Sequence, residues 1–209
     1  AIGSAVTPLT GFQLDATHPQ SIDPAVGTFD DLDELIHQAS SRNMRVLIDL
    51  GDLPPAIDLT SIARYWLNRG IAGFHIAGTQ QAIQLRKIAA SYIGQRIVIG
   101  DVDPSASSTA GGHEGPQLLL DARLSRINQL TAANIRPAIE AIQPGQNALL
   151  ATDAPDTPRS ITRLGDGQHD SDIAKLLAAL LFTNPASSLL YYGQETGLPS
   201  PQPDTRSEE

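Results

Sequence analysis

Carboxylates stand at or just after the ends of several apolar runs that the sequence predicts to be strands. Asp49 ends the first long run, Asp101 ends a later one, and Asp121, Asp153 and Asp156 lie in or after two others. Two carboxylates that face one another can act as acid and base, or as acid and nucleophile, in glycoside hydrolysis. Aspartate is also common where a strand turns into a loop, because its side chain caps the following helix. The pattern therefore indicates either a carboxylate-driven hydrolase or a set of helix caps.

His75 lies near the end of the run that precedes Asp101, and it is either a functional side chain or a hydrogen-bonded interior residue. His75, Asp49, Asp101 and Asp156 could together surround a cation, since carboxylates and imidazole suit several metals. Barrel metal-hydrolases usually carry a His-x-His pair, which this sequence lacks. The glycine-rich stretch at residues 111–115 lacks the lysine of a phosphate loop. We expect neither a metal nor a cofactor.

The composition excludes several classes of partner and site. The 209 residues carry a net charge of -9 and no cysteine, so disulfides and thiolate metal sites are excluded. A negative surface repels phosphate backbones and anionic lipids, and no apolar run approaches the roughly 20 residues of a membrane-spanning helix. We therefore expect no nucleic-acid partner and no direct membrane insertion.

The elements that must position these side chains repeat one order, an apolar run followed by a loop and an amphipathic helix. Thr28 and Asp31 predict a capping box at the first helix, and Gly70 predicts the end of the second. The helices are expected at residues 29–42, 59–69, 80–93, 132–142 and 172–182, with Thr79 capping the third. The strands are expected at residues 44–50, 71–77, 96–102, 117–124, 147–152 and 188–192, with another at 1–6. Runs without polar alternation are typical of covered parallel sheets, so the fold class is α/β, a barrel or a doubly wound sheet.

Several segments, in order along the chain, resemble the α-amylase family of glycoside hydrolases. The resemblance begins in the phrase from Gly11 and continues through TFDDLDELIHQASSRNMRVLIDL. The segments that follow it are Tyr65 to Ile76, Ile97 to Val102, Asp156 to Ser160 and Leu189 to Gly197. The resemblance implies a (β/α)8 TIM-type barrel that is incomplete here, starting near the second strand, without the extra domain after the third strand. We expect residues 1–198 to form this barrel segment and residues 199–209 to be a polar tail.

The sequence departs from the family at the positions that carry its chemistry. The family's aspartate nucleophile corresponds to Ala77, and the arginine two residues earlier corresponds to His75. The acid/base glutamate corresponds to Asp101, which is one methylene shorter. An alanine has no nucleophilic atom, so no covalent glycosyl-enzyme can form there. Further losses fall on the motifs of the third and seventh strands, which here read Leu53-Pro54 and Ala154-Pro155-Asp156.

These losses favour a domain without glycosidase activity that acts as a scaffold, an interaction domain or a weak sugar-binding domain. In its losses the chain is similar to the heavy-chain subunits of heteromeric amino-acid transporters. The alternative is a glycoside hydrolase or transglycosidase for α-glucosidic bonds, with Asp101 and Asp156 as the carboxylate pair. The resemblance thus implies a protein partner or an α-glucoside. If a sugar still binds, His75, Arg159 and Phe12 are the expected contacts. Most other aromatic residues fall at positions expected to be core, so a long sugar groove is poorly supplied.

Overall fold

The computed structural model describes residues 19–24, 27–51, 53, 57–102, 115–142 and 147–201. The chain divides into two compact units at residue 120. The N-terminal unit comprises the described residues up to 120, and the C-terminal unit those from 121 onward. Each is described by itself below. The expected strand at residues 1–6, Phe12 and Pro54 lie outside the described residues.

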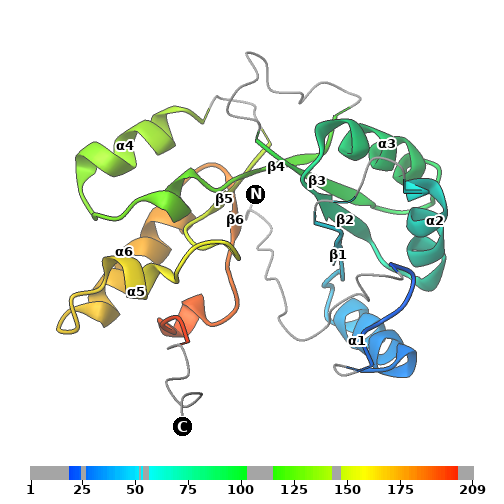
Figure 1. Ribbon diagram of the computed structural model, residues 1–209, viewed down its shortest axis with the longest axis horizontal. Helices are drawn as coiled ribbons and strands as arrows, with labels where there is room; N and C mark the ends of the chain where they lie inside the picture. Colours follow the sequence, from blue (N-terminus) through cyan, green and yellow to red (C-terminus); the bar gives the residue numbers. More distant parts are fainter. Residues whose placement is uncertain are drawn as a thin grey trace, which may run out of the picture. The chain divides into compact units, whose positions relative to one another are not determined.

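The N-terminal unit alternates helices and parallel strands (Figure 1). Its elements are α1 (Phe29–Ser41), β1 (Ile48–Asp49), α2 (Leu59–Arg69), β2 (Gly73–Ile76), α3 (Thr79–Ala90), β3 (Ile97–Asp101) and β4 (Leu118–Asp121), which reaches the boundary. The strands pair in chain order and all in parallel, with Ile48 opposite Phe74, Phe74 opposite Val98 and Ile99 opposite Leu118. Gly73 lets β2 and β3 approach, because a Cβ there would lie 1.8 Å from the Ile97 carbonyl oxygen.

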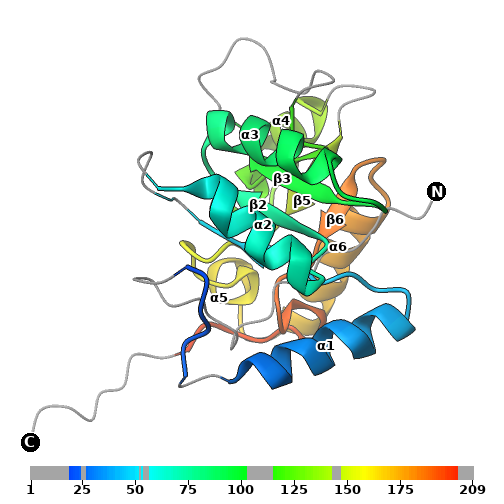
Figure 2. The same cartoon turned by 90° about the vertical axis from the view of Figure 1, so that its right-hand side faces the viewer.

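The core of this unit forms where the helices cover the strands. Trp66 and Phe74 are fully buried, and the Trp66 indole N–H donates to the Pro19 carbonyl at 2.8 Å. Figure 2 shows α2 and α3 side by side over the strands. The capping box of Thr28 and Asp31 is present, and Gly70 ends α2 in the left-handed conformation, so both sequence predictions are confirmed.

The described residues of the C-terminal unit form one parallel strand pair, three α-helices and two short 3-10 helices. These elements are η1 (Arg123–Arg126), α4 (Ala132–Glu140), β5 (Ala148–Ala151), α5 (Ser160–Leu164), α6 (Asp170–Phe182), β6 (Ser187–Leu189) and the short η2 (Gln194–Thr196). In the pair, Leu150 of β5 lies opposite Ser188 of β6. All four residues of β5 are buried, as expected for a strand covered on both faces.

Three sequence predictions about local structure are wrong. The strand expected to reach residue 124 stops at Asp121, because its carboxylate accepts the Arg123 backbone N–H and turns the chain into η1. Gly78, not Thr79, is the N-cap of α3, and it makes no side-chain cap. Phe182 and Tyr192, expected in the core, are 57% and 47% exposed, because Phe182 is the last residue of α6 and Tyr192 lies beyond the end of β6 at Leu189.

Both units have the α/β organisation that the sequence predicts. Parallel strands joined through helices bring the carboxyl ends of neighbouring strands to one edge of each unit, where α/β proteins place their functional side chains. Residues 50–58 are the whole connection between β1 and α2, so no extra domain follows β1. No helix in the described part of the chain has the length and apolar character needed to cross a membrane.

Candidate functional site

The carboxyl edge of the N-terminal unit brings together Asp49, His75 and Asp101, the last or nearly last residues of β1, β2 and β3. Asp49 and His75 are direct partners in the β1–β2 register. Ile99 is the partner of His75 on β3, and Asp101 faces the same side as Ile99 because side chains alternate along a strand. The parallel register therefore places the imidazole between the two carboxylates.

The imidazole contacts both carboxylates directly. Its Nδ1 lies 2.8 Å from Asp49 Oδ1, and its Nε2 lies 2.9 Å from Asp101 Oδ1. The His75 side chain is 20% exposed, against 62% for Asp49 and 41% for Asp101. We name this arrangement the Asp-His-Asp clamp. It ties the ends of three adjacent strands together.

The His75 imidazole of the clamp is positively charged at neutral pH. Burial lowers the pKa of His75, but hydrogen bonds to Asp101 and Asp49 outweigh it and raise that pKa to about 9. Burial raises the pKa of Asp49, but the His75 hydrogen bond and charge, with the Gly51 N–H at 2.8 Å, bring the net pKa below its usual value. At neutral pH both ring nitrogens therefore carry a proton, and both donate to a carboxylate.

Ala77 follows the clamp on the same chain segment. Its backbone N–H donates to the Gly51 carbonyl at 3.1 Å, and the residue is half-buried. Its methyl group cannot attack carbon or move a proton. The site thus offers an imidazolium held between two carboxylates, and a methyl group two residues farther on.

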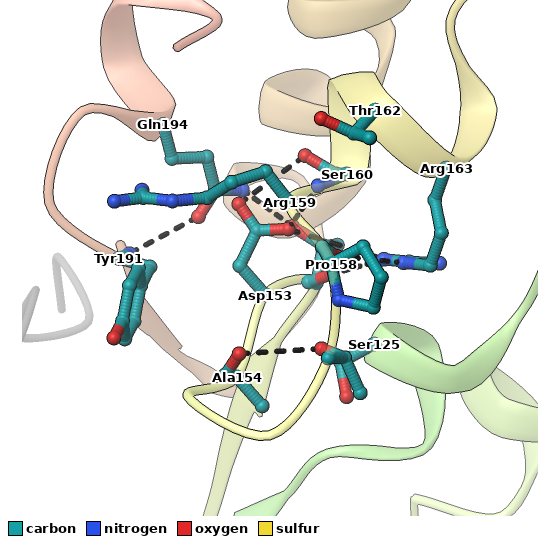
Figure 3. Close-up of polar contacts among 12 residues, drawn as sticks. Ser125, Asp153, Ala154, Pro158, Arg159, Ser160, Thr162, Arg163, Tyr191 and Gln194 are labelled. Carbon is teal, nitrogen blue, oxygen red and sulfur yellow. Dashed lines mark hydrogen bonds and ion pairs between the residues drawn. The ribbon is translucent and has the colours of Figure 1, made fainter. Parts of the chain in front are cut away.

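The carboxyl edge of the C-terminal unit is built differently (Figure 3). Asp153, two residues after β5, is 2% exposed. One of its oxygens accepts the Ser160 backbone N–H at 2.6 Å, and the other accepts the Ser160 hydroxyl at 3.2 Å. Asp153 thereby satisfies the first turn of α5. This is the helix-cap interpretation of a strand-end aspartate rather than the catalytic one.

Arg163 on α5 ties this edge together. Its guanidinium donates to three backbone carbonyls, those of Thr152 at 2.7 Å, Pro158 at 3.1 Å and Ile127. The nearest oxygen of Asp153 is farther away, at 3.9 Å. Burial lowers the pKa of Arg163, and the Asp153 charge opposes that shift only partly. The side chain therefore serves as a buried brace for the loop between β5 and α5.

Two further predicted site residues lie at the same edge. Asp156 is exposed, and its carboxylate is 3.6 Å from the Arg126 guanidinium. The Arg159 guanidinium stacks 4.6 Å above the Tyr191 ring and donates to the Tyr192 carbonyl. Asp101 belongs to the N-terminal unit and Asp156 to the C-terminal unit, so their pairing stays a prediction.

The sequence interpretation missed α5 and the network that anchors it. Pro158 precedes the N-cap Arg159 and does not occupy the first helical position, where proline signals a helix start, so the sequence offered no clear local signal for α5. The partnership of Asp153 with Ser160 depends on the loop geometry and has no local signal either. In the described ranges, no three His, Asp or Glu side chains are arranged to hold a metal ion.

The chain is similar to known proteins in sequence and in fold. No family model matches the sequence. The amino acid transporter heavy chain SLC3A2 of Oryctolagus cuniculus is 25% identical over 207 residues, covering 87% of this chain. The chain spans 38% of the length of that curated relative. The crystal structure of the alpha-glucosyl transfer enzyme XgtA matches with a TM-score of 0.75 and 18% identity, over 95% of this chain and 61% of that one. The fold is therefore that of a partial (β/α)8 barrel, as the sequence predicts.

Proposed function

We propose, from the relationship of this chain to the α-amylase family, that it is a barrel segment without glycosidase activity that serves protein interaction. The observation that carries the proposal is the clamp. Asp101, at the position of the family's acid/base, accepts a hydrogen bond from His75 at 2.9 Å. A general acid must hold a proton and give it to the leaving oxygen. Asp101 instead accepts a hydrogen bond from His75, so one of its oxygens is already engaged.

The second support is the missing attacking group. The retaining mechanism of the family needs a carboxylate on the sugar carbon, and the corresponding residue is Ala77. In the C-terminal unit, Asp153 is engaged by Ser160, so it does not supply a free carboxylate either. Loss of the nucleophile at Ala77, together with the engagement of Asp101 by His75, argues against the family's retaining mechanism.

The test is hydrolysis of maltooligosaccharides and aryl α-glucosides by the full-length protein. We expect no turnover above that of the Asp101→Asn variant. Activity that is present in the parent protein and lost in Asp101→Asn would overturn the proposal. The matched control is Asp58→Asn, an N-cap of α2 that the resemblance does not place in catalysis.

A second candidate is retained hydrolysis or transfer of α-glucosyl groups with Asp101 and Asp156. The observation in its favour is that Asp156 is 66% exposed and meets Arg126 only at 3.6 Å, so a sugar could displace that contact. The structural neighbour XgtA is named for α-glucosyl transfer. Equal loss of turnover in Asp101→Asn and Asp156→Asn would favour this candidate, whereas the first proposal expects no turnover to lose.

A further inference from the structure

The N-terminal unit has a second polar edge, opposite the clamp. We name it the amino edge, and it consists of the connections that lead into β1, β2 and β3, at residues 42–47, 70–72 and 91–96. These connections carry Arg42, Arg45 and Arg96 and no acidic residue, in a chain whose net charge is -9. The carboxyl edge carries Asp49 and Asp101. The charge of this unit is thus divided between its two edges.

Arg45 and Arg96 lie at one level of the sheet. The Ala72 backbone donates its N–H to the Val46 carbonyl at 2.9 Å and accepts from the Ile97 N–H at 3.0 Å. Arg45 and Arg96 directly precede these two partners on the segments that flank β2. Since neighbouring strands lie roughly 4.8 Å apart, the two backbones are about 10 Å apart across β2.

None of the three arginines is paired with a carboxylate in the part of the chain that the structure describes. Arg42 donates to the Gln38 carbonyl at 2.9 Å, and Arg45 to the Met44 carbonyl at 3.0 Å. The Nε of Arg96 is buried without a hydrogen-bond partner. Arg42 is the C-cap of α1, where the helix dipole stabilises a positive charge. Arg45 and Arg96 lie beyond the helix ends, so the helix dipole does not account for their positions.

Two large, exposed apolar side chains belong to the same connections. Met44 is 53% exposed and Ile93 is 96% exposed. Met44 precedes Arg45, and Ile93 lies in the connection that ends at Arg96. Burial of such exposed aliphatic side chains against a partner is favourable, because it removes apolar surface from water. The amino edge therefore combines guanidinium groups that pair with no carboxylate of the described residues and exposed apolar side chains.

We propose that the amino edge binds an acidic protein segment whose carboxylates reach Arg45 and Arg96, whose backbones are about 10 Å apart, and whose apolar side chains cover Met44 and Ile93. Ten ångströms is roughly the rise of seven helical residues, so a helix with Glu at positions i and i+7 and Leu at i+3 and i+4 has this spacing. Arginine favours such partners because its planar fork bonds carboxylates in pairs. This inference rests on the interaction role proposed above, but not on the absence of hydrolysis.

A fluorescently labelled helical peptide with that Glu and Leu pattern tests the proposal by anisotropy titration of the whole chain at low salt. We expect micromolar binding, weakened about tenfold when both Glu are replaced by Gln and weakened with rising salt. Arg45→Ser with Ile93→Ser should weaken binding at least about tenfold, and Arg96→Ser should do so independently. Arg64→Ser removes an exposed arginine from the middle of α2 and should leave binding unchanged.

Unchanged thermal unfolding of the Arg45→Ser, Ile93→Ser variant shows that its effect is on binding, because both side chains lie outside the core. No binding at millimolar peptide, or equal binding by this variant and the parent, would overturn the proposal. Binding to phosphatidylserine vesicles in place of the peptide would also overturn it, and so would self-association that the same substitutions abolish. The hydrolysis assay is independent of these outcomes, so each proposal can fail alone.

Discussion

The carboxyl edges of the two units use strand-end aspartates in opposite ways. In the N-terminal unit, Asp49 and Asp101 are 62% and 41% exposed and share one charged imidazole. In the C-terminal unit, Asp153 is 2% exposed and serves the start of α5, while Arg163 braces the surrounding carbonyls. Charges that water can still reach contribute little to stability, whereas buried polar groups are costly to leave unpaired. The same residue type therefore has a different energetic role in each unit.

Arg163→Met removes the guanidinium that braces the C-terminal edge and should cause the largest loss of unfolding free energy. The thioether keeps much of the side-chain volume but leaves the Thr152 and Pro158 carbonyls without their donor. Removing one partner of a buried charged network costs about 3–5 kcal/mol of unfolding free energy. Urea denaturation of the parent and variant measures this loss.

The matched variant is Asp153→Asn, which retains an oxygen to accept the Ser160 N–H. Because Asp153 lies 3.9 Å from Arg163, its charge is the weaker part of the network. We expect its effect to be less than half that of Arg163→Met. An equal loss would show that the ion pair, and not the carbonyl contacts, holds the loop.

His75→Gln tests the exposed side. Gln can still hydrogen-bond but carries no charge, and water can solvate the two carboxylates that it leaves. We expect a loss of about 1 kcal/mol of unfolding free energy by urea denaturation. His37→Gln, at an exposed position of α1, is the control and should have almost no effect. A loss approaching that of Arg163→Met would mean that the clamp is far less solvated than its exposure indicates.

The stabilisation that His75 provides should depend on pH. His75 has a folded-state pKa of about 9, above its usual 6.5, so its stabilising contribution is fully present below pH 6.5. That contribution falls as pH rises through 9. The difference in unfolding free energy between the parent and His75→Gln should therefore shrink between pH 6.5 and pH 10. A nuclear magnetic resonance titration of the imidazole with a midpoint near pH 6.5 would contradict this.

Helix ends could be predicted from the sequence, whereas contacts between strands could not. The capping box of Thr28 and Asp31 and the glycine that ends α2 are local signals, since each depends on residues within one turn. The clamp joins Asp49 to His75 and His75 to Asp101, each 26 positions apart, and depends on the strand register. The sequence identified all three residues but not their contacts. The turn at Asp121 was missed because the predicted strand was continued from the apolar run at residues 118–120 through Ala122 to Leu124.

Asp156→Asn should have the smallest effect and separates an exposed ion pair from both networks. Asp156 and Arg126 are 66% and 71% exposed at 3.6 Å, so solvent competes with their attraction and salt screens it. We expect a change below about 0.5 kcal/mol in unfolding free energy, measured by urea denaturation at low salt. Arg126→Gln should give the same small value, and the double variant should add nothing further. A larger coupling between the two would mean that Asp156 has a buried role, which would weaken the case for a displaceable carboxylate and with it the second candidate function.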